Sequence, residues 1–246
     1  MNLHPVTTKI FQAHEDLYSF IRSNVKKLRD SSILAVTSKI VALSEGRVAI
    51  AKDAAQKARI IRKESEWAIP AKYAWLTLKD GIIMANAGID DSNANGKLIL
   101  LPKNSFDAAN KLHKKLRAHY KIKNLGVVIT DSHVRPNRSG IIGIALGYAG
   151  FQGIKDYRGS SDIFGRKMKI TQLNIADSIA TACVLVMGEG RERRPLAIVE
   201  DAPVKFTNRV DKKELLIEMK DDMYWPIFRP HSGRGQVKIA KPKRNS

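Results

Sequence analysis

The sequence predicts a fold that combines α-helices with β-strands. Hydrophobic residues recur at helical spacing in Glu15–Arg29 and in Ser105–Tyr120, which predicts two amphipathic helices. Leu125–Ile129 is a short apolar run rich in β-branched residues, which is typical of a buried strand. Trp75–Ala85 alternates around Lys79-Asp80-Gly81, and this pattern predicts a hairpin. A chain of 246 residues can bury such elements in one large domain or two small ones.

The N-terminal half supplies three further elements. Ser32–Ala42 is apolar and predicts a strand that runs into a turn closed by Ser44–Arg47. Lys52–Trp67 is polar and basic, so we expect a helix with one face in water. Asn, Asp and Gly are dense in Asn86–Asp90, which predicts a shaped turn rather than a regular element.

The C-terminal half contains the stretch around which the chain is organised. A helix is expected to begin with Ser105 as its N-cap. The strand Leu125–Ile129 is expected to stop at Thr130, so that the polar cluster Asp131-Ser132-His133 opens a loop. Arg135 and Arg138 follow on either side of Pro136, whose ring stiffens the turn. An acid that can hold a metal thus lies beside two guanidiniums that can hold phosphate, although a solvated turn with surface charges is the plain alternative.

Glycines and a capping residue mark the last elements. Five glycines interrupt the apolar stretch 140–153, which indicates close backbone approach or strand bending. Asn174 is expected to cap a helix over Ile175–Met187, and Asp177 at its third position is better explained by capping than by catalysis. Pro195–Val199 is the last predicted strand.

Composition limits the class of protein. Lys and Arg number 43 against 24 acids, a net charge of +19 that favours anionic partners. Arg229–Ser246 holds six of these cations and no acid, which predicts a flexible basic tail. Cys183 is the only cysteine and lies in an apolar stretch, so we expect a core residue and neither a disulfide nor a zinc cluster. The N-terminus lacks a signal-peptide pattern and no apolar stretch is long enough to span a bilayer, so we expect a cytoplasmic protein that does not contact membranes.

Oxygen-bearing side chains are the candidate metal ligands. Asp90, Asp131 with Ser132, and Glu189 each follow an apolar element, and hard oxygen donors with few nearby histidines suit Mg²⁺ or Mn²⁺ rather than zinc. Spacing alone leaves open whether they converge in space. Gly188 and Gly190 flank Glu189 and would let backbone amides approach phosphate, although a glycine helix stop explains them as well.

Eight short motifs, in order along residues 5–199, resemble one known family. They are Ser38-Lys39 with Glu45-Gly46-Arg47, NAGIDDSN at 86–93, LLP at 100–102, ITDSHVRPNR at 129–138, ALGYAG at 145–150, DYRG at 156–159, DIFGR at 162–166 and VMGEG at 186–190. Each motif is weak by itself, but the ordered set resembles the coenzyme F420:L-glutamate ligases, also called F420-0:γ-glutamyl ligases.

The resemblance implies an α+β fold of mixed sheets and packed helices, with two subunits intertwined as a homodimer. It implies a GTP-dependent ligase that joins L-glutamate through a γ-linked amide to a carboxylate acceptor, by way of an acyl phosphate. The family's metal ligands match Asp90, Asp131, Ser132 and Glu189, which implies two Mg²⁺ or Mn²⁺ ions. Its nucleotide contacts match Ser38, Asn93 and the loop 187–194 with Met187, Gly188 and Gly190, and there are further contacts near 8–11. Arg135 and Arg138 are the candidate catalytic residues.

Departures from the family pattern bear on the acceptor. Ser132 replaces the more usual Thr and keeps the hydroxyl, Val134 stands where the family has Gly, and Leu43 occupies a position where many members carry Lys. Several motifs are more similar to a bacterial branch associated with folate γ-glutamylation, so a deazaflavin and a folate-type acceptor both stay open. We expect a ligase domain over 1–210, with room for two subdomains, and a C-terminal extension over 211–246.

The charge also supports an alternative of another class, a non-enzymatic nucleic-acid-binding protein on a ligase-like fold. Such a protein would bind RNA or DNA with a steep salt dependence. The chain has few aromatic residues and no RNA- or DNA-binding motif, which favours the ligase.

Overall fold

The computed structural model describes residues 1–228, which form two compact units. The first unit comprises Met1–Ala49 and Ile99–Leu215, and the second comprises Ile50–Leu98 and the segment from Leu216 onward. The predicted division into 1–210 and 211–246 stays a prediction, and the proposed basic tail, Arg229–Ser246, lies outside the described residues. Over residues 1–228, no helix has the length and apolar character that crossing a bilayer requires.

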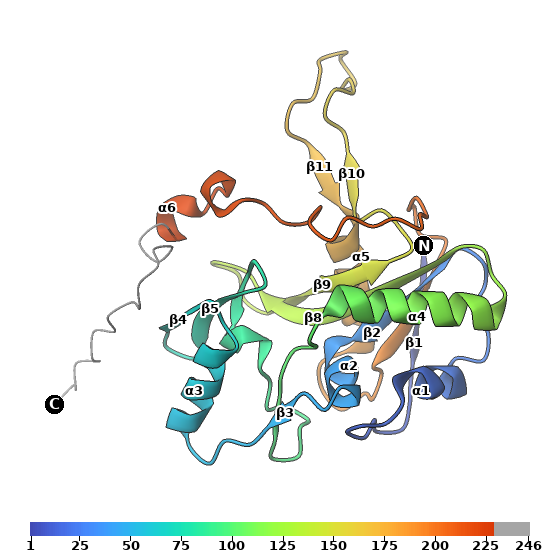
Figure 1. Cartoon of the computed structure of the whole chain (residues 1–246). Helices are drawn as coiled ribbons and strands as arrows, with labels where there is room; N and C mark the ends of the chain where they lie inside the picture. The colour runs from blue at the N-terminus through green and yellow to red at the C-terminus, as the bar shows by residue number, and fades with distance from the viewer. Residues whose placement is uncertain (229–246) are drawn as a thin grey trace. The chain divides into compact units, whose positions relative to one another are not determined.

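A mixed five-stranded sheet forms the centre of the first unit (Figure 1). β2 and β8 run parallel, whereas the other neighbours in the sheet are antiparallel. This arrangement with its packed helices confirms the α+β class. The strands, in their order across the sheet, are β1 (Asn2–Val6), β12 (Leu196–Glu200), β2 (Ser32–Thr37), β8 (Leu125–Val134) and β9 (Ile141–Ala149).

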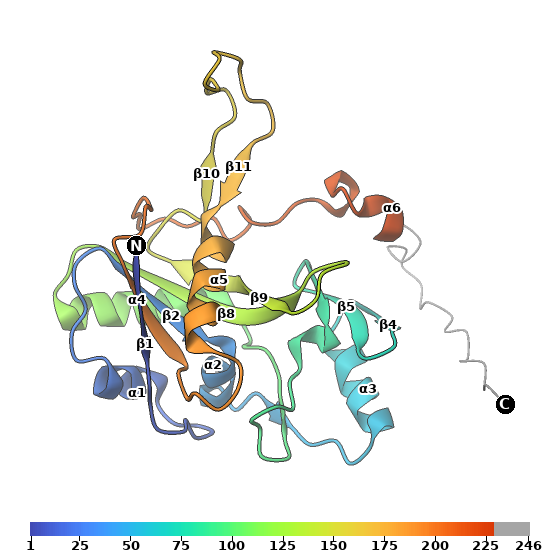
Figure 2. The same cartoon turned by 180° about the vertical axis from the view of Figure 1, so that it is seen from behind.

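Helices cover both faces of this sheet, as the opposite views in Figures 1 and 2 show. One face packs against α1 (Leu17–Asn24), α2 (Ser38–Ser44) and α4 (Ser105–Tyr120). The other packs against α5 (Ile175–Met187). Val127 and Ile129 of β8 enter the first core and Val128 enters the second, because successive side chains of a strand point to opposite faces.

Close backbone approach explains two glycines of β9. A Cβ atom on Gly143 would lie 2.4 Å from the Ala180 carbonyl oxygen of α5, and one on Gly147 would lie 2.4 Å from the Ser105 carbonyl carbon of α4. The two glycines face opposite helices because a bulge leaves Leu146 without a partner on β8. The predicted close approach is therefore confirmed.

The structure also contains two small sheets and a long arm. β3 (Val48–Ala49) pairs with β7 (Leu98–Ile99). β10 (Ile154–Asp156) and β11 (Gln172–Asn174) form an antiparallel pair at the base of an arm that projects from the body of the unit (Figures 1 and 2). Ile163 and Phe164 near its tip are 92% and 88% exposed.

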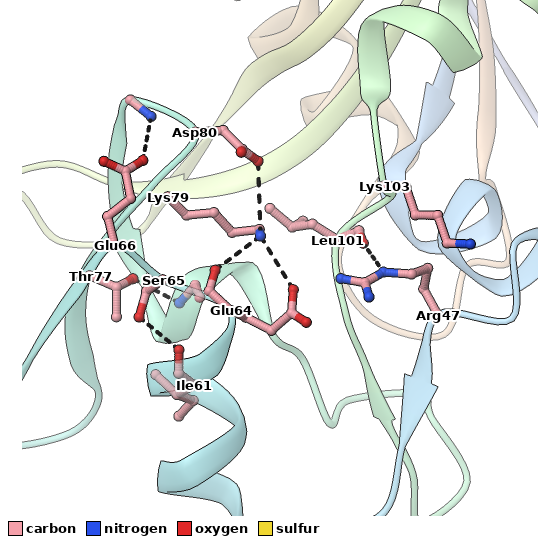
Figure 3. A network of polar contacts seen from close by, with 12 residues as sticks. Arg47, Ile61, Glu64, Ser65, Glu66, Thr77, Lys79, Asp80, Leu101 and Lys103 are labelled. Carbon is pink, nitrogen blue, oxygen red and sulfur yellow. Dashed lines mark hydrogen bonds and ion pairs between the residues drawn. The ribbon is translucent and has the colours of Figure 1, made fainter.

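The second unit contains a helix and a three-stranded antiparallel sheet. α3 (Ala54–Lys63) precedes β4 (Trp67–Pro70), β5 (Trp75–Lys79) and β6 (Ile82–Ala85), and the β5–β6 hairpin confirms the predicted one. The Lys79 ammonium lies 3.3 Å from a Glu64 carboxylate oxygen and 3.9 Å from one of Asp80 (Figure 3). The shaped turn after β6 is confirmed as a 3-10 turn, η1 (Asn86–Gly88), in which Asn86 and Ala87 have positive φ. A second 3-10 turn, η2 (Met219–Asp221), and α6 (Trp225–Phe228) follow in the C-terminal segment.

Several sequence-based boundaries were wrong. The first helix is shorter than Glu15–Arg29 because the Asn24 amide caps the Phe20 carbonyl and the chain becomes extended at Val25. The apolar stretch after Ser32 is not one strand but β2 followed by α2, since a continuous apolar run gives no periodicity that separates the two. The basic helix is shorter than the predicted range Lys52–Trp67, because Trp67 belongs to β4.

An asparagine caps each of the two long helices, α4 and α5. Asn104 rather than Ser105 caps α4, accepting a hydrogen bond from the Asp107 amide. Asn174 caps α5 as predicted. Asp177 serves in the cap and also accepts a hydrogen bond from the Ala145 amide of β9 at 2.8 Å. Cys183 is buried in the core, and burial raises the pKa of its thiol to about 12.

Candidate functional site

The polar cluster Asp131-Ser132-His133 lies on a strand and not in a loop, which corrects the sequence-based expectation. β8 continues to Val134 because β9 pairs with it as far as Ile141. This hydrogen-bond ladder satisfies the backbone whatever the polarity of the side chains. The turn that was expected after Thr130 begins only after Val134.

Ser38 and Asp131 meet at one edge of the sheet. β2 and β8 are parallel and pair as far as Thr37 and Thr130, so the next residue of each chain segment emerges at the same edge. Ser38 begins α2 there and is buried, and its hydroxyl donates a hydrogen bond to Asp131 Oδ1 at 2.7 Å. A predicted nucleotide contact and a predicted metal ligand are therefore adjacent, although 93 residues separate them in the sequence.

Ser132 and Glu189 form the second pair. Glu189 lies just after the end of α5, where Met187 is the last helical residue and Gly188 follows with φ 78°. The Ser132 hydroxyl donates a hydrogen bond to Glu189 Oε1 at 2.7 Å. Asp131 thus contacts the start of α2 and Ser132 the end of α5, the helices that pack on opposite faces of the sheet.

The loop after α5 already holds a carboxylate against its backbone. The Gly190 amide donates to Glu192 Oε2 at 2.8 Å. A Cβ atom on Gly188 would lie 2.6 Å from the Glu192 carboxyl carbon, so the carboxylate packs against both glycines. Gly188 ends the helix, as the alternative of a glycine helix stop predicted. The two glycines also leave room for an anion. Sequence reasoning missed Glu192, because the run Arg191–Arg194 resembles an ordinary exposed stretch of charges.

Arg135 and Arg138 lie in the exposed turn between β8 and β9. The Arg138 amide donates to the Arg135 carbonyl at 3.3 Å, and Asn137 between them has a φ of 54°. Neither guanidinium has a hydrogen-bond or ion-pair partner within residues 1–228. His133 precedes them on β8, where burial and then Arg135 lower the pKa of its imidazole.

Asp90 and Asn93 belong to the second unit. Both Asp90 carboxylate oxygens accept hydrogen bonds from Ser92, one from its amide and one from its hydroxyl, each at 2.7 Å. Asn93 adopts a positive φ of 53° in the same turn. Convergence of Asp90 with Asp131 and Glu189 stays a prediction.

The donor set suits a hard divalent cation. Carboxylate and hydroxyl oxygens are the ligands that Mg²⁺ and Mn²⁺ prefer, and the chain presents them from Asp131, Ser132 and Glu189. Across the part of the chain that the structure describes, no three His, Cys, Asp or Glu side chains form a cluster that could hold a metal ion. The site thus consists of two hydrogen-bonded pairs rather than a preformed cage of acids.

Comparison with known proteins gives the same family along most of the chain. The model of the family described as F420-0:Gamma-glutamyl ligase matches residues 5–201. A coenzyme F420:L-glutamate ligase of Methanococcus maripaludis strain C7 is 32% identical over 215 residues, which cover 80% of this chain and 86% of that protein. The protein of the same name from Methanopyrus kandleri is 32% identical over 203 residues, which cover 75% of this chain and 80% of that protein.

A coenzyme F420:L-glutamate ligase of Methanocaldococcus jannaschii is 38% identical over 146 residues, which cover 59% of this chain and 58% of that protein. The family match includes every candidate site residue from Ser38 to Gly190. These matches identify an enzyme of the ligase class. The chain belongs to the F420-0:γ-glutamyl ligase family.

Proposed function

We propose that this protein is a GTP- and divalent-metal-dependent γ-glutamyl ligase that adds L-glutamate to the carboxylate of a coenzyme F420-0-like or folate-type acceptor. The observation that carries the proposal is the meeting of Ser38 with Asp131 and of Ser132 with Glu189. Three segments far apart in the sequence deliver these oxygens to the end of one strand. The hydrogen bond between Ser132 and Glu189 is exposed, so a ligand can reach this pair from solvent.

Asp90, Asp131, Ser132 and Glu189 would hold the metal ions in this proposal. Two bound Mg²⁺ or Mn²⁺ ions would supply positive charge against the nucleotide's phosphates. The Ser132 hydroxyl, which now donates to Glu189, can rotate to offer a lone pair. Ser38, Asn93 and the loop containing Met187, Gly188 and Gly190 would contact GTP. That a backbone amide of this loop already accommodates a carboxylate supports a role in binding phosphate.

The reaction proceeds in two balanced steps. An oxygen of the acceptor carboxylate attacks the γ-phosphorus of GTP, and the bond to GDP breaks, which leaves an acyl phosphate. The amine of glutamate then attacks the acyl carbon, phosphate departs, and the nitrogen loses a proton as the amide forms. Arg135 and Arg138 would hold the acceptor carboxylate or the transferred phosphoryl group, since a guanidinium offers paired N–H donors to such oxygens.

Activity of an Asp131→Asn variant tests the proposal. The protein is incubated with GTP, Mn²⁺, L-glutamate and either acceptor, and products are identified by mass spectrometry as gains of one or more glutamyl units. We expect a loss of at least about a hundredfold in Asp131→Asn, because the amide removes the charge needed for a cation. Asp107→Asn is the matched control, since Asp107 is an acid of α4 that pairs with Lys212 and forms no hydrogen bond or ion pair with a candidate site residue within residues 1–228. Equal activity of Asp131→Asn and the control would contradict the proposal, and the product mass names the acceptor.

A homodimer is part of the same proposal. The arm between β10 and β11 exposes Ile163, Phe164 and Ile170 almost completely, and large apolar side chains exposed in this way are typical of an interface. We expect light scattering after size exclusion to give twice the chain mass, and Phe164→Asp to shift the protein toward monomer. Arg166→Gln, a polar change in the same arm, is the control. A monomeric wild-type protein would refute this part.

A further inference from the structure

A cavity of about 260 Å³ lies in the first unit beside the last turns of α4 and the beginning of β8. Leu125 opens β8, and Asp131 lies six residues farther along the strand. At about 3.3 Å per residue, the cavity is about 20 Å from the candidate site. It is a separate feature, and its lining includes His113, Arg117, Lys123, Phe206 and Asn208.

The lining of this cavity carries positive charge. Arg117 and Lys123 contribute to it, and none of the described lining residues is an acid. One guanidinium nitrogen of Arg117 donates to Asn208 Oδ1 at 2.6 Å. Its remaining N–H groups have no acceptor among residues 1–228. The cavity therefore contains a cation whose hydrogen-bonding capacity is largely unused.

His113 adds an imidazole to the same wall. Its side chain is on α4 four residues before Arg117, so the two lie on one face of the helix. His113 is only 5% exposed, and no residue among 1–228 forms a hydrogen bond with its imidazole. An imidazole that lines a cavity and has no protein partner leaves its ring N–H and its lone pair available to a ligand.

Gly150 lets the backbone of this wall approach Leu125 and His113 closely. Its φ is 88°, and a Cβ atom there would lie 1.9 Å from the Leu125 carbonyl oxygen and 3.0 Å from His113 Cδ2. Apolar atoms of Ile122 and Phe206 form part of the remaining lining. The cavity thus combines unused cationic donors with apolar surface.

We propose that this cavity binds the phosphate group of a small molecule, either free phosphate or a phosphomonoester. Phosphate oxygens can accept hydrogen bonds from the Arg117 guanidinium, the His113 ring N–H and the Lys123 ammonium at the same time. An organic group attached to the phosphate would contact Ile122 and Phe206. The proposal rests on geometry and charge in the first unit alone, and it is independent of the ligase reaction.

The His113 resonance in ¹H–¹³C NMR spectra tests the proposal on the full chain. The chain has six histidines, and a His113→Gln variant assigns the signal. The probes are inorganic phosphate, phenyl phosphate and phenol. A saturable shift with inorganic phosphate supports the free anion, and a shift with phenyl phosphate alone supports a phosphomonoester. No saturable shift with either phosphate in the millimolar range, or an equal response to phenol, would overturn the proposal.

Matched variants separate ligand binding from a structural role of Arg117. We expect Arg117→Gln to weaken phosphate binding at least about tenfold, because it removes a charged donor. Asn208→Ala removes the internal acceptor and leaves every cation, so binding should persist or strengthen. Arg166→Gln lowers the net charge equally in the exposed arm and should leave binding unchanged. Equal weakening by Arg117→Gln and Asn208→Ala, or by Arg117→Gln and Arg166→Gln, would count against the site.

Discussion

Replacing Gly143 by Ala should displace Glu189 from Ser132 by moving α5. The added Cβ would lie 2.4 Å from the Ala180 carbonyl oxygen, whereas ordinary contacts begin at 3.4 Å, so helix and strand must separate by about 1 Å. Overpacking of this kind costs about 1–3 kcal/mol. For a chain of this size each kcal/mol lowers Tm by about 2–4 °C, so we expect a fall of about 2–12 °C. Misplacing a catalytic group by about 1 Å can cost about a hundredfold in rate.

Gly147→Ala is the matched control, since it places the same Cβ on the same strand but against α4. Its Tm should fall by a similar amount, while the Ser132–Glu189 pair and the activity measured well below Tm should remain. Calorimetry and the glutamylation assay measure the two effects separately. Full activity in Gly143→Ala, or equal loss of activity in the two variants, would refute the idea that close packing of α5 positions Glu189.

Two further predictions concern charge. Glu192→Gln should tighten GTP binding about fivefold, because it removes about 1 kcal/mol of repulsion between the Glu192 carboxylate at Gly190 and an incoming phosphate. Calorimetric titration measures the GTP affinity, with the exposed change Glu218→Gln as the control. An unchanged GTP affinity in Glu192→Gln would contradict this prediction. Burial, then Arg117 and Lys114, lower the pKa of His113 below its usual 6.5, so the folded state takes up its proton less readily than the unfolded state. The stability that His113 contributes is complete above pH 6.5 and is lost as pH falls through the folded pKa. The urea midpoint of the wild-type protein should therefore decline more steeply between about pH 7 and 5 than that of His113→Gln. Parallel curves for the two proteins would refute the lowered pKa of His113.

Local sequence signals determined those elements whose evidence lies within a few residues. Helical spacing gave α4 with its observed bounds, the Asn174 cap and Gly188 bounded α5, and Asp80-Gly81 gave the β5–β6 hairpin. Each depends on backbone preferences or side-chain contacts between near neighbours, so the pattern is complete in the sequence. The ordered motifs likewise identified the ligase family before any geometry was known.

Tertiary structure decided what depends on distant partners. β8 extends through Asp131 and Ser132 because β9 supplies its hydrogen-bond ladder, which no local polarity rule reveals. The parallel register of β2 and β8 brings Ser38 to Asp131, and the alternation of faces sends Ser132 toward Glu189 instead. The contact of Glu192 with the glycine loop and the cavity beside His113 likewise depend on the folded arrangement of the chain. The sequence therefore named the groups, whereas the pairing of strands and the packing of helices determined which of them touch.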